Sequence, residues 1–381
     1  MKSILILFHC ESNTGYAIET LESVFFKMAC ALVNQDHSRI HIAYTSMTKG
    51  RPRALPETFQ QYTVFDIANA DLAGCEKFQQ YLEQRSIDTV LAFDQPVHRA
   101  AYRYLRDGGV KCFVSYWGAP ISSIFGPIKR TLKRLEVALR RHGPDHYIFE
   151  SEGMAQTAVL GRGIRAKRVH VAYLGVDTEK FKPDPVDAGY IHDALQIPAA
   201  RRIFFYSGHM EHRKGVGTIM QAANVLAAGR TEDDWHIVLT GNRPGEETAL
   251  LAQLSDNART HVTFGGYRAD IPRLHRGCHA GIIASVGWDS LTYSSLEMQS
   301  SGLPLLLSDL LGLREAVEHE ISGELFPPGN AQALAARMIG LLDDGSLRQR
   351  LAGGARKRAL ALFTKEQQLN RLTALMRQFS S

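Results

Sequence analysis

Short apolar runs alternate with amphipathic, helix-like segments along the whole chain. In the first half, the runs that predict strands are residues 3–8, 39–45, 88–93, 111–115, 146–149 and 169–172. Helical periodicity fills most of the intervals between them, for example residues 70–84 and 97–107. Because the runs are almost continuously apolar, we expect both faces of each strand to be covered, which is typical of parallel sheets. The alternation therefore predicts a doubly wound α/β layer.

A break in this pattern divides the chain. Residues 181–198 hold three prolines, which predicts a linker. The pattern then restarts, with strands predicted at residues 202–206, 235–240, 262–264, 280–285 and 304–308. We expect an N-terminal Rossmann-like domain over residues 1–183, a C-terminal one over residues 184–362, and a terminal helix within residues 363–381 that packs back on the first domain. Two such domains would enclose a cleft between the carboxyl ends of their strands, where ligands bind in doubly wound folds.

Length and composition fit this picture and exclude several classes of protein. A chain of 381 residues with 45% hydrophobic residues is long enough for two packed cores. The net charge of +5 is too small to argue for a nucleic-acid partner and fits anionic ligands or a membrane surface. The five cysteines show no metal-ligand spacing, which predicts a reduced, cytoplasmic protein. No apolar run approaches the roughly 18 residues of a membrane span.

The stretch of residues 284–304 holds the most informative chemistry. Asp289 follows an apolar strand, and Glu297 lies about a turn and a half into a helix that begins near Thr292. A helix N-terminus presents backbone N–H groups and the positive end of the helix dipole, which suit a phosphate or diphosphate. Carboxylates suit hydroxyl groups, so the combination points to a sugar nucleotide. The plainer alternative is a surface ion pair between a loop Asp and a helix Glu.

A second candidate is the loop over residues 208–215, which follows another predicted strand. Gly208 makes the turn, and Arg213 and Lys214 precede a helix that starts near Gly215. Cations at the mouth of a strand–turn–helix unit can clamp a diphosphate. A solvated basic loop without a ligand is the alternative.

These features form part of an ordered set of motifs in the second half of the chain. The set consists of Gly208 with Lys214, Ser285, the Asp289–Glu297 pair, Gly302 to Pro304, Gly312 with Glu315, Gly323, and Leu174 to Asp177 with Phe181. Together they resemble glycosyltransferase family 4, the retaining nucleotide-sugar transferases of the GT-B fold. The resemblance covers nearly all of residues 204–342.

The resemblance implies roles for particular residues. Asp289, Lys214 and Arg213 would be the catalytic group, with Asp289 touching the transferred sugar and the two cations neutralising the departing diphosphate. The residues that would bind the donor are Glu297, on the ribose hydroxyls, with Gly208, His209, Thr292, Tyr293, Ser285 and Arg268. No cofactor or metal is expected, because Asp233 and Asp234 lie just before a strand, at the wrong end for the cleft.

The same resemblance places acceptor contacts in the first half of the chain. The loop of Asn13, Thr14 and Gly15 follows the first strand and would face the cleft. Trp117 stands where the family has a His near the donor sugar, so it either stacks on a sugar or packs in the core. Two further departures from the family are Asp289 in place of Glu and His209 in place of Arg; they leave the donor sugar open.

The segment of residues 127–141 predicts a basic amphipathic helix. Four apolar residues fall on one face, and six Lys or Arg side chains stand against one Glu. One interpretation is a helix that lies on anionic lipid at the inner face of the membrane; the other is a helix that docks its leucines on the sheet.

The sequence thus predicts a retaining glycosyltransferase that moves a sugar from a nucleotide-diphosphate sugar to a hydroxyl acceptor. The acceptor would be a glycan or lipid-linked molecule in polysaccharide, lipopolysaccharide or glycolipid assembly. The alternative is a catalytically inactive sugar-nucleotide-binding or scaffolding protein of the same fold. A dinucleotide-binding enzyme is disfavoured because no Gly-x-Gly-x-x-Gly follows the first strand of either half.

Overall fold

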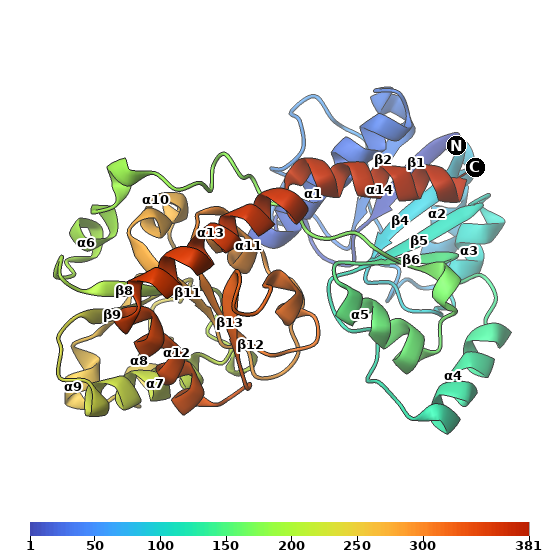
Figure 1. The fold of residues 1–381 in the computed structure, drawn as a ribbon. Coiled ribbons are helices and arrows are strands. Elements are labelled where there is room, and N and C mark those ends of the chain that lie inside the picture. Colours follow the sequence, from blue (N-terminus) through green and yellow to red (C-terminus); the bar gives the residue numbers. More distant parts are fainter. Residues whose placement is uncertain (381) are drawn as a thin grey trace. The chain divides into compact units, whose positions relative to one another are not determined.

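The computed structural model describes residues 1–380 and divides into two compact units, each built on a parallel sheet (Figure 1). The first unit contains Met1–Tyr173 and the C-terminal helix from Glu366 onward; the second contains Leu174–Lys365. The predicted pair of doubly wound α/β domains is therefore what the chain forms.

The sheet of the first unit has seven strands in the order β3-β2-β1-β4-β5-β6-β7, all parallel. Its strands are β1 Ser3–Leu7, β2 Ile40–Tyr44, β3 Tyr62–Val64, β4 Ile87–Phe93, β5 Cys112–Trp117, β6 His146–Phe149 and β7 Val169–Val171. Its helices are α1 Tyr16–Leu32, α2 Leu72–Gln84, α3 Tyr102–Asp107, α4 Pro127–Leu139, α5 Glu152–Gln156 and α14 Lys365–Ser380. The strand order reverses between β1 and β4, so the loops that follow these two strands flank the switch point of this sheet.

The sheet of the second unit has six parallel strands in the order β10-β9-β8-β11-β12-β13. Its strands are β8 Arg202–Ser207, β9 Trp235–Thr240, β10 Val262–Phe264, β11 Cys278–Ile283, β12 Leu305–Ser308 and β13 Gly323–Phe326. Its helices are α6 Tyr190–Leu195, α7 Val216–Gly229, α8 Thr248–Leu251, α9 Asp256–Arg259, α10 Ile271–Arg276, α11 Tyr293–Ser300, α12 Ala331–Asp343 and α13 Gly345–Leu362. Here the order reverses between β8 and β11, and ligands of such sheets bind where the loops after these strands meet.

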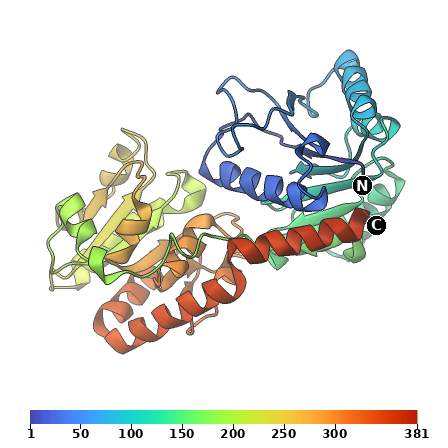
Figure 2. The ribbon, with the colours of Figure 1, turned by 90° about the horizontal axis from the view of Figure 1, so that it is seen from above.

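The C-terminal helix α14 lies along the first unit, as expected from the sequence (Figure 2). Its guanidinium groups reach backbone carbonyls of that unit: Arg371 donates to Val171 over 3.1 Å, and Arg377 to Ala31 over 3.3 Å. Phe379 stacks on the ring of His146 with 3.9 Å between the ring centroids. Helix α14 is thus packed against the first unit.

The division between the units falls after Tyr173, earlier than the boundary at residue 183 that the prolines indicate. The reason lies in the contacts of the linker. Val176 donates its backbone N–H to Phe363 over 2.8 Å, and Arg356 donates to the carbonyl of Phe181 over 3.0 Å. The residues that lead into the prolines are therefore already held by the second unit.

Candidate functional site

The loops that follow β8 and β11 meet at the switch point of the second sheet. Gly215 has a φ of 70°, and a Cβ added there would lie 1.7 Å from the carbonyl oxygen of Ala284. A residue with a side chain would force the two loops apart, so glycine is required here. Val286 donates its backbone N–H to the carbonyl of Arg213 over 2.9 Å. This close approach brings the basic loop and the acidic loop into one cluster.

The centre of this cluster is an ion pair between Lys214 and Asp289. The Lys214 Nζ donates to Asp289 Oδ2 over 2.8 Å, and the Ser285 hydroxyl donates to the same oxygen over 2.7 Å. Arg213 Nη1 lies 3.7 Å from the other carboxylate oxygen. Asp289 is only 5% exposed, so its charge is compensated by two cations rather than by water. Arg213 Nη2 also lies 3.4 Å from Glu211 Oε2, so the two cations are shared between Asp289 and a second, more exposed carboxylate.

A tryptophan that the sequence analysis did not single out stands beside this pair. The Arg213 guanidinium carbon lies 4.4 Å from the centroid of the Trp288 ring, and its Nη1 donates to the Trp288 carbonyl over 3.1 Å. Trp288 remains 43% exposed. A part-exposed tryptophan next to a charged cluster can contribute stacking area to a bound ligand. The cation–π contact also fixes where the guanidinium points.

Helix α11 begins at the same edge of the sheet. Thr292 is its N-cap, with its hydroxyl accepting the backbone N–H of Ser295 over 3.1 Å. Ser294 donates its hydroxyl to the carbonyl of Ser207 over 2.8 Å, which ties the first turn of α11 to the end of β8. The positive end of the α11 dipole is thereby held next to the end of β8, from which the loop of Lys214 departs.

Glu297 lies in the second turn of α11 and is buried. The helix sits close to β11, since a Cβ at Gly281 would lie 2.4 Å from the Met298 sulfur. Sequence spacing placed Glu297 within a short helix that starts near Thr292, and the helix starts at Tyr293. A carboxylate held within a packed helix has a fixed position, as recognition of a pair of hydroxyl groups requires.

The remaining donor-binding candidates fall into two groups. Gly208 follows β8 and donates its N–H to the carbonyl of Thr240 over 3.1 Å, and His209 is exposed beside it. Arg268 follows β10 but pairs with Asp270, whose Oδ1 lies 2.8 Å from Arg268 Nε. The Arg268 guanidinium lowers the pKa of the Asp270 carboxyl to about 2. The structure thus joins Arg268 to Asp270 and not to the cluster around Asp289.

The acceptor candidates of the first unit have structural partners. The side-chain amide of Asn13 donates to the carbonyls of Lys49 over 3.0 Å and Arg51 over 2.9 Å, so Asn13 holds a neighbouring loop in place. Thr14 donates its hydroxyl to the Glu11 carbonyl. Gly15, with a φ of 148° and open space where a Cβ would be, is the N-cap of α1.

Trp117 ends β5 and is half-buried. Its indole N–H donates to the Gln95 carbonyl over 3.2 Å, and its ring stacks with Phe149. Asp94, which the sequence analysis did not identify, lies at the end of the adjacent strand β4 with a φ of 50°. Burial raises the pKa of the Asp94 carboxyl to about 7, and His9 lies 4.0 Å away. A carboxyl shifted in this way at a strand end is typical of a functional site.

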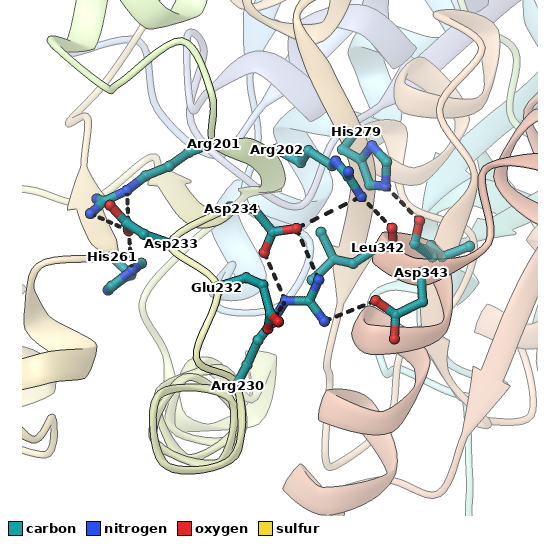
Figure 3. A network of polar contacts seen from close by, with 11 residues as sticks. Arg201, Arg202, Arg230, Glu232, Asp233, Asp234, His261, His279, Leu342 and Asp343 are labelled. Atoms are coloured by element: carbon teal, nitrogen blue, oxygen red, sulfur yellow. Dashed lines mark hydrogen bonds and ion pairs between the residues drawn. The ribbon is translucent and has the colours of Figure 1, made fainter.

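Asp233 and Asp234 belong to a separate network at the opposite, amino-terminal edge of the second sheet (Figure 3). Arg201 donates to Asp233 over 2.8 Å, His261 Nε2 lies 2.7 Å from the same carboxylate, and Arg230 donates to Asp234 over 2.7 Å. Both acids are thus engaged by arginines, as expected for residues that stabilise the fold. Within residues 1–380 the structure shows no group of three or more His, Cys, Asp or Glu side chains arranged to hold a metal ion.

Two family models together match most of the chain. The model of "Glycosyltransferase Family 4" matches residues 21–180, and that of "Glycosyl transferases group 1" matches residues 189–358. The chain belongs to glycosyltransferase family 4. The motif resemblance described above is thereby confirmed, and the first of the two matches extends it into the N-terminal half.

Curated relatives of this family 4 chain match it over about half of their length. The amylovoran biosynthesis glycosyltransferase AmsK of Erwinia amylovora is 26% identical over 194 residues, which are 49% of this chain and 45% of that protein. The D-inositol 3-phosphate glycosyltransferase of Thermobispora bispora is 27% identical over 202 residues, 51% of this chain and 46% of the relative.

Solved structures share the fold over the whole chain. A glycosyltransferase from Rickettsia africae has a TM-score of 0.80 at 14% identity, covering 100% of this chain and 99% of the other. Anabaena Alr3699/HepE in complex with UDP has a TM-score of 0.76 at 20% identity, covering 99% and 100%. The GT-B assignment of the fold is confirmed by this likeness. No helix within residues 1–380 combines the length and the apolar character that crossing a membrane requires.

Proposed function

We propose that this family 4 chain is a retaining glycosyltransferase that moves a sugar from a nucleotide-diphosphate sugar to a hydroxyl acceptor. The observation that carries the proposal is the cluster of Lys214, Arg213 and Asp289 beside the N-terminus of α11. Cations and a helix dipole converge there at the switch point of the second sheet, where such folds bind ligands.

The cluster supplies what cleavage of a glycosyl–phosphate bond demands. Negative charge develops on the departing diphosphate, and groups that already point at this charge lower the barrier. Lys214 and Arg213 would each interact with both Asp289 and the diphosphate. The first turn of α11 would hold the distal phosphate. The Asp289 carboxylate would then accept a hydrogen bond from a hydroxyl of the transferred sugar. We propose that the transfer requires no metal ion.

Glu297 completes the proposed donor site. Its buried carboxylate is suited to the two ribose hydroxyls, because an ionised carboxylate has two acceptor oxygens. Trp288 adds an exposed aromatic face next to Arg213. A uridine nucleotide is the first donor to test, since Alr3699/HepE has been solved with UDP and with UDP-glucose.

The acceptor is proposed to be a glycan or a lipid-linked sugar, handled at the cytoplasmic face of a membrane. Two relatives support this choice by name. The phosphatidyl-myo-inositol mannosyltransferase of Mycolicibacterium smegmatis is 28% identical over 176 residues, and the Escherichia coli UDP-Gal:alpha-D-GlcNAc-diphosphoundecaprenol alpha-1,3-galactosyltransferase is 24% identical over 180 residues.

The test begins with thermal-shift screening against UDP, GDP, ADP and dTDP sugars and ends with transfer to lipid-linked and free glycan acceptors. The anomeric configuration of the product, read by NMR, tests retention, and an unchanged rate in EDTA tests independence from metal. Affinity for a nucleotide sugar with neither transfer nor donor hydrolysis would favour the inactive binding protein. That alternative draws on Asp289, which is shorter than the Glu of the family and already engaged by Lys214 and Ser285.

A further inference from the structure

Helix α4 exposes an apolar stripe that no described residue of the first unit covers. Ile128 is 82% and Leu139 81% exposed, and Leu132 and Leu135 between them are exposed as well. Their spacing puts all four on one face of the helix. Within Pro127–Leu139 only Val137 is buried, and at 3.6 residues per turn it lies opposite this stripe. The interpretation in which the leucines dock on the sheet is therefore wrong.

The helix is attached to the unit by its other side. Figure 1 shows α4 at the edge of the first unit, and α4 packs against Thr157–Arg162, the segment that continues α5. Arg162 donates to both oxygens of Glu136, over 2.8 and 3.1 Å, and Lys133 donates to Glu136 over 3.0 Å. A Cβ at Gly163 would lie 2.7 Å from the backbone nitrogen of Arg134, so the contact is close. These contacts attach α4 to the first unit with its apolar stripe facing solvent.

The charges around the stripe are mostly positive. Six basic side chains lie on α4 and just after it: Lys129, Arg130, Lys133, Arg134, Arg140 and Arg141. Glu136 is the one acid among them, and its pairing with Arg162 and Lys133 lowers its pKa to about 2. Just before α4, Ile124 is exposed, and Lys129 Nζ lies 3.9 Å above the ring of Phe125. The apolar surface therefore continues past the start of the helix and remains flanked by cations.

We infer that α4 docks this chain on an anionic lipid leaflet. The helix lies in the plane of the interface, with Ile128, Leu132, Leu135 and Leu139 in the acyl boundary and the flanking Lys and Arg side chains at the lipid phosphates. The long basic side chains can extend from the helix to the phosphates while their stems cover apolar surface. A second copy of the chain is a poor occupant, because pairing two stripes would bring two sets of six cations together. The inference rests on the proposed function in one respect only: a lipid-linked acceptor gives the chain a reason to bind a membrane.

The first test is co-flotation of the full chain with vesicles of phosphatidylcholine alone or with about a third phosphatidylglycerol. We expect the anionic vesicles to bind at least about tenfold more tightly, and added salt to weaken this binding. The charge variant K129Q/R134Q/R140Q, which removes three exposed cations and keeps the Lys133–Glu136 pair, should lose about tenfold or more in affinity for them. The apolar variant L132S/L135S should no longer stay bound to the anionic vesicles, even at low salt. Wild-type affinity in either variant, or no binding by the wild-type chain, would overturn the inference.

A matched control lies on α13 of the second unit. The variant R350Q/K357Q/L360S removes two exposed cations and one exposed leucine from another helix, and its vesicle binding should equal that of the wild type. Thermal melts of all variants check that they fold. A monomer–dimer shift that the apolar variant abolishes, without any effect on flotation, would instead identify the stripe as a self-association surface.

The nucleotide thermal shift, measured on the same variants, separates this inference from the proposed function. It should be unchanged in all of them, because α4 contributes no residue to the cluster around Lys214. Vesicle binding without any thermal shift by nucleotides would overturn the proposed function alone. A thermal shift by nucleotides without vesicle binding would overturn the docking role alone.

Discussion

The ammonium group of Lys214 lies 2.8 Å from Asp289 Oδ2, although the two residues are 75 positions apart in the chain. The same carboxylate oxygen accepts the hydroxyl of Ser285. The pair therefore spans the switch point of the second sheet and fixes the distance between the basic and acidic loops. Asp289 thus holds Lys214 in the position from which, on the proposed function, Lys214 would meet a diphosphate.

Lys214→Ala should lower the transfer rate kcat by about 100- to 1000-fold, the usual effect of removing a group that stabilises charge in the transition state. Lys214→Arg, which keeps the charge, should retain more of the rate. Steady-state kinetics with the donor found by thermal shift is the measurement. Because Asp289 would keep only Ser285 and the more distant Arg213 as partners, the melting temperature must be recorded as well. A folded Lys214→Ala protein within about threefold of the wild-type kcat would contradict the role of Lys214.

Glu297→Ala should weaken nucleotide-sugar binding by about 10- to 100-fold, the range expected when hydrogen bonds to a charged group are lost. The dissociation constant from calorimetry is the readout. Glu318→Ala removes an exposed carboxylate from the same unit and should leave that constant unchanged. If both variants bind equally well, the ribose contact has been assigned to the wrong residue.

Much of this fold could be predicted from the chain, because buried parallel strands are almost continuously apolar. The predictions missed β3 and β13, each of which is an edge strand of its sheet. β3 exposes Val64, and Glu324 interrupts the apolar run of β13, so neither carries the expected pattern. Periodicity also predicted the apolar face of α4, but it did not predict whether that face packs against the protein or lies in solvent. Only the packing of Val137 and Glu136 shows that the face points outward.

The candidate site was less accessible to sequence reasoning than the fold. Motif spacing led to the prediction of Lys214, Asp289 and Glu297 as site residues, since strand ends and helix starts fix where such residues fall. It did not predict that Arg268 pairs with Asp270, two residues further along the chain. Trp288 stood next to Asp289 in the sequence, but its role depends on the guanidinium of Arg213, which only the folded loops bring over its ring.

The N-cap of α11 should contribute to stability as well as to the site. Thr292→Ala removes the acceptor for the Ser295 N–H and should lower the free energy of unfolding by about 1 kcal/mol. Thr292→Ser keeps the hydroxyl and serves as the control. Denaturant titration of both variants measures the effect; equal loss in the two would mean that the methyl group and not the cap is responsible.

Glu22 provides a test of stability against pH that is independent of any ligand. It lies in α1 and is 2% exposed; the Tyr44 hydroxyl donates to its Oε1, while Oε2 has no hydrogen-bond partner among the described residues. Burial raises the pKa of the Glu22 carboxyl to about 7, from an ordinary value of 4.5. Between these two values the folded chain holds a proton that the unfolded chain has released. Stability must therefore fall as the pH rises through this window.

Glu22→Gln should abolish that fall, because the amide stays neutral and its oxygen can still accept from Tyr44. At pH 8 the variant should melt a few degrees above the wild type, with about 3 kcal/mol as the upper bound from the pKa shift. Near pH 4.5 the two should converge, since the carboxyl is then protonated in the folded wild type. Glu76→Gln changes an exposed carboxylate on α2 and should show no such dependence. A difference in melting temperature between Glu22→Gln and the wild type that stays the same at both pH values would mean that the side chain acts through packing rather than through its charge.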